Sequence, residues 1–278
     1  RGRSPPDPLG RGTPPAPPRR SAGDRRATRA ELGLADDQIL ALTVANYRKK
    51  KDYPNLLRAA RIVADAPPAL RWIVVGQGPL EDEVHELHRR LHLQGAVTLL
   101  GYRSDVPRLL AAADLIVIGS RHEGLPVTVM EAFALGVPVV TTAVGGLPGV
   151  VEEGVNGLLV PPGRPDLLAA AVDRVVADAG LRRTLAQGAV RSSDQFDITR
   201  TQRRGGEIYS SLLPPHEPHR PQPPDRPGTP DAAKPTVLWV IKGLGPGGAE
   251  RLLVHHARYA SDGFSLAAAY VLPAKGHL

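Results

Sequence analysis

The sequence predicts an α/β protein built on a doubly wound parallel sheet, and three observations support this prediction. Between residues 30 and 213, short runs of Val, Ile and Leu recur, mostly without apolar–polar alternation, which is typical of strands buried on both faces. Segments with helical periodicity separate these runs. Proline-rich segments bound the region on both sides, and 42 % of the 278 residues are hydrophobic, which is enough for a core.

Six strands are expected in this region: Ile39–Ala45, Arg71–Val75, Ala96–Leu100, Asp114–Ile118, Val137–Thr142 and Gly157–Val160. Two of the helices between them have clear signals. One places four apolar residues on a single face at the helical period: Leu80, Val84, Leu87 and Leu91. Pro165 opens another apolar-periodic run, as expected of proline in a first helical turn.

The two flanking segments are expected to lack a fold. Residues 1–29 are predicted to be a disordered Arg/Pro-rich tail, and residues 214–235 a Pro-rich linker that acts as a semi-rigid spacer. The tail holds eight arginines and two aspartates, a net charge of +6 out of +7 for the whole chain. Because the rest is nearly neutral and only 4 % of residues are aromatic, specific nucleic-acid binding is not expected.

Residues 236–278 are predicted to be the truncated start of a second domain of the same kind. They contain a strand, a glycine-rich loop, a helix and a second strand: Thr236–Ile241, Lys242–Gly248, Ala249–Tyr259 and Leu266–Leu272. The loop also fits the G-x-G-x-x-G dinucleotide fingerprint. That fingerprint expects an acidic residue at the end of the next strand, where this chain has Leu272-Pro273-Ala274-Lys275, so a nicotinamide site is the weaker interpretation.

The composition excludes several classes of protein and site. The chain has no cysteine, which removes disulfides, Cys-ligated zinc and cysteine nucleophiles. No apolar run reaches the ~18 residues of a membrane span, so we expect a cytoplasmic protein, with peripheral attachment to the inner membrane face as an option. Residue 1 is Arg rather than Met, and we expect further sequence upstream.

Candidate ligand-binding residues follow the strands, because ligands of open parallel sheets bind beyond the strands' carboxyl ends. Residues 46–52 (NYRKKKD) form a basic loop that is either a solvated surface or a clamp for a phosphorylated ligand. Gly76 and Gly78 allow a close backbone approach, by a ligand or simply in a tight turn. Arg103 could support a nucleobase, with Ser104 or Asp105 as a plain helix N-cap in the competing interpretation.

The most informative stretch is Ser120–Ala132, which contains two carboxylates. Pro126 suits a helix start, so Glu123 is expected in the loop and Glu131 on the second turn, where both can face one crevice. Free amides at the helix start, near Gly124 and Leu125, offer an anion site. The alternative is a surface acid and an unrelated acid on the helix face.

The run EGLPVTVMEAFALGVPVVTTAVGGLPGVVEEGVNGLLVPPG resembles the signature of the retaining glycosyltransferases of group 1, family 4. These enzymes have two Rossmann-like domains, the GT-B architecture, and residues 30–213 resemble their C-terminal, nucleotide-sugar-binding domain. The resemblance implies that Glu131 binds the donor ribose, that Glu123 contacts the transferring sugar and that Lys51 binds the diphosphate. The family's Gly-Arg pair is Ala45-Asn46 here, which leaves Arg48 as the substitute.

The second region resembles the start of the N-terminal, acceptor-binding domain of the same enzymes, which adds Gly247 and Gly248 as donor-binding residues. This order implies either a slice of a tandem fusion or a permuted enzyme; in both cases an N-terminal GT-B domain is missing as a partner. Gly149 stands where the family commonly has glutamate after Gly-Gly-x-Pro.

The resemblance implies transfer of a sugar from a nucleoside diphosphate to an unknown glycan, lipid or small-molecule acceptor, without a metal or other cofactor. A non-catalytic nucleotide-sugar-binding module and a sugar-nucleotide epimerase of the same architecture are the alternatives. His85, His88 and His92 share a helical face, but a solvated face explains them better than a metal site.

Overall fold

The computed structural model describes residues 22–64, 70–197, 200, 203–205, 207–208, 211, 236–241 and 265–270. Its internal contacts divide the chain into two units, Arg1–Asp194 and Gln195–Leu278. The first unit contains the whole of the main sheet with its helices, and the second contains a separate pair of strands.

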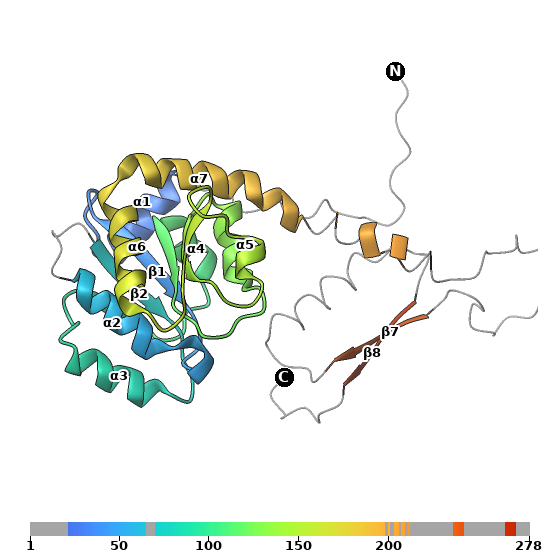
Figure 1. Cartoon of the computed structure of the whole chain (residues 1–278), viewed down its shortest axis with the longest axis horizontal. Coiled ribbons are helices and arrows are strands. Elements are labelled where there is room, and N and C mark those ends of the chain that lie inside the picture. Colours follow the sequence, from blue (N-terminus) through green and yellow to red (C-terminus); the bar gives the residue numbers. More distant parts are fainter. Residues whose placement is uncertain are drawn as a thin grey trace, which may run out of the picture. The chain divides into compact units, whose positions relative to one another are not determined.

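Six parallel strands form the sheet of the first unit in the order β3-β2-β1-β4-β5-β6 (Figure 1). They are β1 (Ile39–Val44), β2 (Leu70–Val75), β3 (Val97–Leu99), β4 (Leu115–Ile118), β5 (Val139–Thr142) and β6 (Gly157–Val160). The predicted doubly wound parallel sheet is therefore confirmed. β5 begins two residues later than predicted because Pro138 has no N–H to donate to a neighbouring strand.

Seven α-helices and three short 3₁₀ helices precede, connect or follow these strands within the described part of the first unit and its boundary. They are α1 (Ala22–Glu31), η1 (Lys49–Lys51), α2 (Tyr53–Val63), α3 (Glu81–Arg90), α4 (Val106–Ala112), α5 (Val127–Ala134), η2 (Leu147–Gly149), α6 (Pro165–Ala177), α7 (Ala179–Ser193) and η3 (Asp194–Phe196). The helix predicted from the Leu80 stripe and the one opened by Pro165 are both present as α3 and α6.

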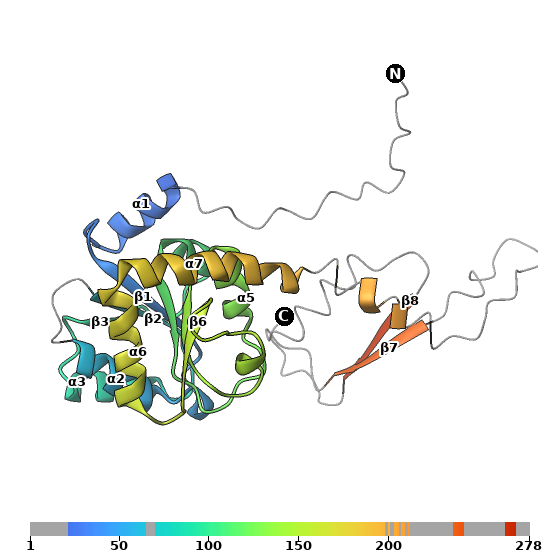
Figure 2. The same ribbon diagram turned by 45° about the horizontal axis from the view of Figure 1, so that its top comes forward.

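The helices cover both faces of the sheet, as the continuous apolar strands require (Figures 1 and 2). α2, α3 and α6 share one core cluster with alternate strand residues such as Ala41 and Val140. α4 and α5 bury Leu109, Leu110 and Phe133 outside that cluster, and they belong to the opposite layer. Every described residue of β4 and β5 is buried.

The start of the folded domain differs from the prediction, because residues 22–29, assigned to the disordered tail, form most of α1. Arg25 donates to the Ala112 carbonyl at 2.5 Å and pairs with Asp114 at 2.6 Å. Arg29 is 5 % exposed and pairs with the same carboxylate at 3.1 Å. These arginines therefore neutralise Asp114 and the carboxyl end of α4. The assignment of residues 1–21 to a tail lies outside the described residues.

The second unit contains β7 (Thr236–Ile241) and β8 (Ser265–Tyr270), which pair in parallel with Thr236 opposite Ser265. The first strand matches its prediction, and the second begins one residue earlier and ends two earlier than Leu266–Leu272. The predicted linker, the glycine-rich loop with Gly247 and Gly248, and the helix Ala249–Tyr259 lie outside the described residues.

Candidate functional site

The strand order reverses between β1 and β4, and the predicted ligand residues lie beyond these two strands. β1 and β4 are neighbours, with Ala41 opposite Leu115. The connection from β1 leads to β2, toward one edge of the sheet, and the connection from β4 leads to β5, toward the other edge. The region where the segments 45–52 and 119–126 follow these strands is called the crevice below, because it is the usual ligand position in this class of sheet.

Hydrogen bonds join the two segments across the base of this crevice. The Lys50 carbonyl accepts the backbone amides of Arg121 at 2.9 Å and His122 at 3.3 Å. The Arg121 Nε donates to the carboxylate of Asp52 at 2.6 Å. Asp52 is 4 % exposed and has a left-handed backbone with φ of +46°, so the turn between η1 and α2 is held in a strained conformation by contacts with the other segment.

Lys51 and Glu123, predicted from separate motifs, meet in this crevice. The Lys51 Nζ lies 2.5 Å from the Glu123 Oε1, and their side chains are only 16 % and 6 % exposed. A lysine and a carboxylate so poorly solvated compensate each other's charge. Arg48 is exposed, and no ion pair of its side chain occurs among the described residues.

The Glu123 carboxylate has a second partner that the sequence did not predict. The Ser120 Oγ donates to the same Oε1 at 2.7 Å, and the Ser120 carbonyl accepts the Thr142 hydroxyl at 2.6 Å. Ser120 is 1 % exposed and Thr142 is fully buried. Ser120 lies three residues before Glu123, and this short spacing was a signal in the sequence that the two side chains could meet. Thr142 becomes a neighbour of Ser120 through the pairing of β4 with β5, which the local sequence does not indicate.

The start of α5 supplies backbone donors beside the carboxylate. Glu123 lies in the loop and Glu131 on the second turn of the helix, as predicted, and Glu131 is partly buried. Within the described part of the chain, the amides of Gly124 and Leu125 donate to no protein group. Free amides at a helix start carry partial positive charge and favour an anion.

Positions 145 and 146 have room only for glycine, because their loop packs on the backbone of the loop that contains Glu123. The Gly146 amide donates to the Gly124 carbonyl at 2.8 Å. A Cβ on Gly145, whose φ is +58°, would lie 1.8 Å from the Glu123 carbonyl oxygen. A side chain at Gly145 would therefore push the Glu123 loop out of place.

Gly76 and Gly78 have a similar structural explanation, which replaces the ligand approach considered for them. A Cβ on Gly76 would lie 1.9 Å from the Ala45 carbonyl oxygen, and one on Gly78 would lie 2.6 Å from that of Tyr47. The space beside both glycines is filled by the chain that follows β1. These glycines hold the basic loop against β2 and leave no room for a ligand there.

Arg103 is held in a clasp with two acids instead of joining the Lys51–Glu123 pair. Its guanidinium binds Asp105 through two 2.7 Å hydrogen bonds and Glu31 at 2.9 Å. These contacts lower the pKa of both carboxyls, with the hydrogen bond from Arg103 as the largest cause in each, and raise the pKa of the guanidinium. Asp105 occupies the N-cap position of α4 without a capping side-chain bond.

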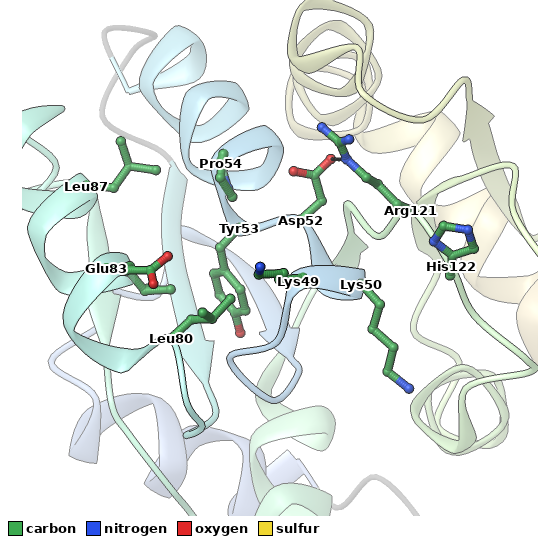
Figure 3. Close-up of a pocket in the computed structure, with 11 residues that line it drawn as sticks. Lys49, Lys50, Asp52, Tyr53, Pro54, Leu80, Glu83, Leu87, Arg121 and His122 are labelled. Carbon is green, nitrogen blue, oxygen red and sulfur yellow. Dashed lines mark hydrogen bonds and ion pairs between the residues drawn. The ribbon is translucent and has the colours of Figure 1, made fainter.

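A pocket of about 430 Å³ is lined by members of both predicted segments, the basic loop 46–52 and the stretch Ser120–Ala132, but not by Arg48, Lys51 or Glu123. Figure 3 shows Glu83 and Leu87 of α3 and the N-cap residue Leu80 on one side, with Arg121 and His122 on the other. Lys49, Lys50, Asp52, Tyr53, Pro54 and Val84 complete the lining. The apolar stripe of α3 was visible in the sequence, but its junction with the 119–126 segment was not.

Within the described residues, no group of three His, Asp or Glu side chains is placed to hold a metal ion. The His88 Nε2 lies 2.8 Å from the Val97 carbonyl, so this histidine has a structural contact. None of the helices among these residues has both the length and the apolarity to cross a bilayer.

Residues 24–191 match the family model described as glycosyl transferases group 1. The D-inositol 3-phosphate glycosyltransferase of Salinispora arenicola is 35 % identical over 213 residues, which cover 71 % of this chain and 48 % of that protein. The chain thus spans about half the length of the curated relatives it matches.

Solved structures give the same picture. HepE of Anabaena in complex with UDP superposes with a TM-score of 0.65 at 33 % identity, covering 70 % of this chain and 54 % of that one. The same protein was also solved with UDP-glucose. The C-terminal domain of the group 1 protein LpcC from Francisella tularensis has the same fold at 22 % identity and a TM-score of 0.55, with 62 % of this chain and 91 % of that domain covered.

Proposed function

Because the chain belongs to the glycosyl transferases group 1 family, we propose that residues 22–197 bind the nucleoside-diphosphate-sugar donor of a retaining, family 4 glycosyltransferase. The complete enzyme would move the sugar to a glycan, lipid or small-molecule acceptor. The observation that carries the proposal is the convergence of Lys51 and Glu123 at the strand-order reversal.

The diphosphate would lie between the basic loop and the start of α5. Lys51 and Arg48 supply cationic donors from one side, and the unused amides of Gly124 and Leu125 supply backbone donors from the other. The negative charge that develops on the leaving phosphate oxygen when the sugar–oxygen bond breaks can be stabilised by such preorganised donors alone. We therefore propose donor binding and departure without a divalent metal.

Each carboxylate has a distinct role in this proposal. Glu131, on the second turn of α5, would accept hydrogen bonds from the ribose hydroxyls. Glu123, at the base of the crevice, would contact the transferring sugar, where positive charge develops during transfer. The ion pairs of Arg103 use the edges of its guanidinium, so its flat face can support the base.

UDP is the first nucleotide to test, because HepE binds UDP and UDP-glucose. Calorimetry with UDP, GDP and ADP, with and without a chelator, tests the proposal. Binding of at least one nucleotide that survives chelation is the expected result; binding by none, or a strict metal requirement, contradicts it.

Two variants in the same calorimetry test the site assignment. Glu131→Ala should weaken nucleotide binding by about 1.5–3 kcal/mol, the contribution of hydrogen bonds to a charged group. Asp173→Ala, an exposed acid on α6, is the matched control and should leave the affinity unchanged. Unaltered affinity in a folded Glu131→Ala protein would make the ribose assignment wrong.

A further inference from the structure

We propose that Ser120 and Thr142 are positioning residues that aim the Glu123 carboxylate at the transferring sugar, an inference that rests on the proposed function. Both hydroxyls belong to one chain of hydrogen bonds. It runs from the Thr142 hydroxyl to the Ser120 carbonyl, and from the Ser120 hydroxyl to the Glu123 Oε1. Neither residue would touch the donor.

The chain of hydrogen bonds fixes one carboxylate oxygen and leaves the other for a ligand. Lys51 and Ser120 both bind Oε1, and no hydrogen bond to Oε2 occurs among the described residues. When a diphosphate competes for Lys51, the Ser120 hydroxyl is the remaining donor on Oε1. Ser120 would therefore keep the carboxylate oriented at the moment when its ion pair is weakened.

Thr142 has an indirect effect on Glu123, because its hydroxyl holds the backbone carbonyl of Ser120. β5 ends at Thr142, and its hydroxyl bonds across to the first residues after β4. The preceding residue, Thr141, is also fully buried, but it faces the opposite side of the sheet. Among the described residues, its hydroxyl donates only to the Thr142 carbonyl, at 3.3 Å. The two threonines thus form a matched pair in which only one is connected to Glu123.

The test uses the whole chain and compares its dissociation constants for UDP and UDP-glucose. The ratio of the two constants isolates the contribution of the sugar, which a general loss of stability would not change selectively. Ser120→Ala should reduce the sugar's contribution about tenfold, the value of one hydrogen bond to a charged group. Thr142→Val should reduce it less, Thr142→Ser should restore it, and Thr141→Val should leave it as in the wild type.

The outcomes separate this inference from the proposed function. If Glu123→Gln changes the ratio but Ser120→Ala and Thr142→Val do not, the positioning role is wrong and the function stands. If Glu123→Gln leaves the ratio unchanged, Glu123 has no sugar contact and the inference fails while nucleotide binding stands. A wild type that binds neither ligand contradicts both.

Discussion

Two buried tyrosines, one in the basic loop and one at the start of α2, differ in whether the hydroxyl has a hydrogen-bond partner. Tyr47 and Tyr53 pack edge to face with ring centroids 4.8 Å apart. The Tyr53 hydroxyl donates to the Ala45 carbonyl at 2.5 Å, whereas the buried Tyr47 hydroxyl has no hydrogen-bond partner in the part of the chain that the structure describes. Burial raises the pKa of Tyr47 to about 12 and also raises the pKa of Tyr53, so both rings stay neutral near pH 7.

We expect only one of the two phenylalanine variants to be destabilised. Tyr53→Phe should lower the free energy of unfolding by about 1 kcal/mol, because it removes a made hydrogen bond. Tyr47→Phe should leave that free energy unchanged or raise it by up to about 1 kcal/mol, because it removes a buried donor without a partner. Urea denaturation checks this, and equal losses in both variants would contradict the contact pattern.

A second prediction compares Gly145 with Gly149, two glycines in the segment between β5 and β6. Gly145→Ala should cost of the order of 3 kcal/mol of unfolding free energy, because it combines a positive φ with a backbone clash against Glu123. Gly149→Ala is the control, since a Cβ there would meet nothing within 4 Å. Thermal unfolding of the two variants measures the difference, and an unchanged Gly145→Ala melting temperature would count against the described loop packing.

The sequence identified residues with a charged role better than residues with a packing role. The basic loop that contains Lys51 and the stretch that contains Glu123 were noticed because charged residues soon after buried strands are conspicuous, and the family resemblance then implied the role of each residue. Their contact depends on the adjacency of β1 and β4, which are separated by two other strands in the chain. The role of Gly76 and Gly78 was ambiguous, because a glycine indicates that another group packs closely but does not show whether that group is a ligand or the protein's own backbone.

At the scale of elements, the strands were predictable because burial on both faces makes each one a continuous apolar run. The largest error was α1. Its mean composition is polar and arginine-rich, which resembles the tail before it. Arg25 and Arg29 find their partners in tertiary contacts with the carboxyl end of α4 and with Asp114. The pattern of residues within α1 does not indicate these contacts.

The clasp between α1 and α4 should make stability depend on acid pH. Glu31 and Asp105 have folded-state pKa values below the ordinary 4.5 and 3.8 because Arg103 binds both. Depressed values mean that the clasp stabilises the fold fully above about pH 5, and that this contribution is lost as the pH falls through the folded values.

The matched variant for this effect is Arg103→Met, which keeps the length of the side chain and removes its charge. Wild type should have a higher urea midpoint than Arg103→Met at pH 7, and the two midpoints should converge below pH 3. The difference should also shrink in high salt, because the clasp is largely exposed. A difference that persists unchanged at pH 2.5 would show that packing, not charge, explains the Arg103 effect.

For the molecule as a whole, the proposed donor site lies at one edge of the described sheet. Its crevice presents cations, amides and two acids on the edge of a single domain, and the chain corresponds to about half of each relative. Sugar transfer needs the donor to be shielded from water and aligned with an acceptor. The proposed donor-binding domain by itself would provide nucleotide binding, but neither the shielding from water nor the alignment with an acceptor.

We therefore expect the 278-residue chain to bind nucleotide without sustained turnover. UDP should slow amide exchange in the segments 45–52 and 119–126, because the ligand and its contacts restrict opening of these loops. Release of UDP from UDP-glucose, followed with and without candidate acceptors, should stay at the uncatalysed rate. Sustained transfer by this chain would instead mean that its remaining residues complete the active site, and would favour a permuted, self-sufficient enzyme over a slice of a larger fusion.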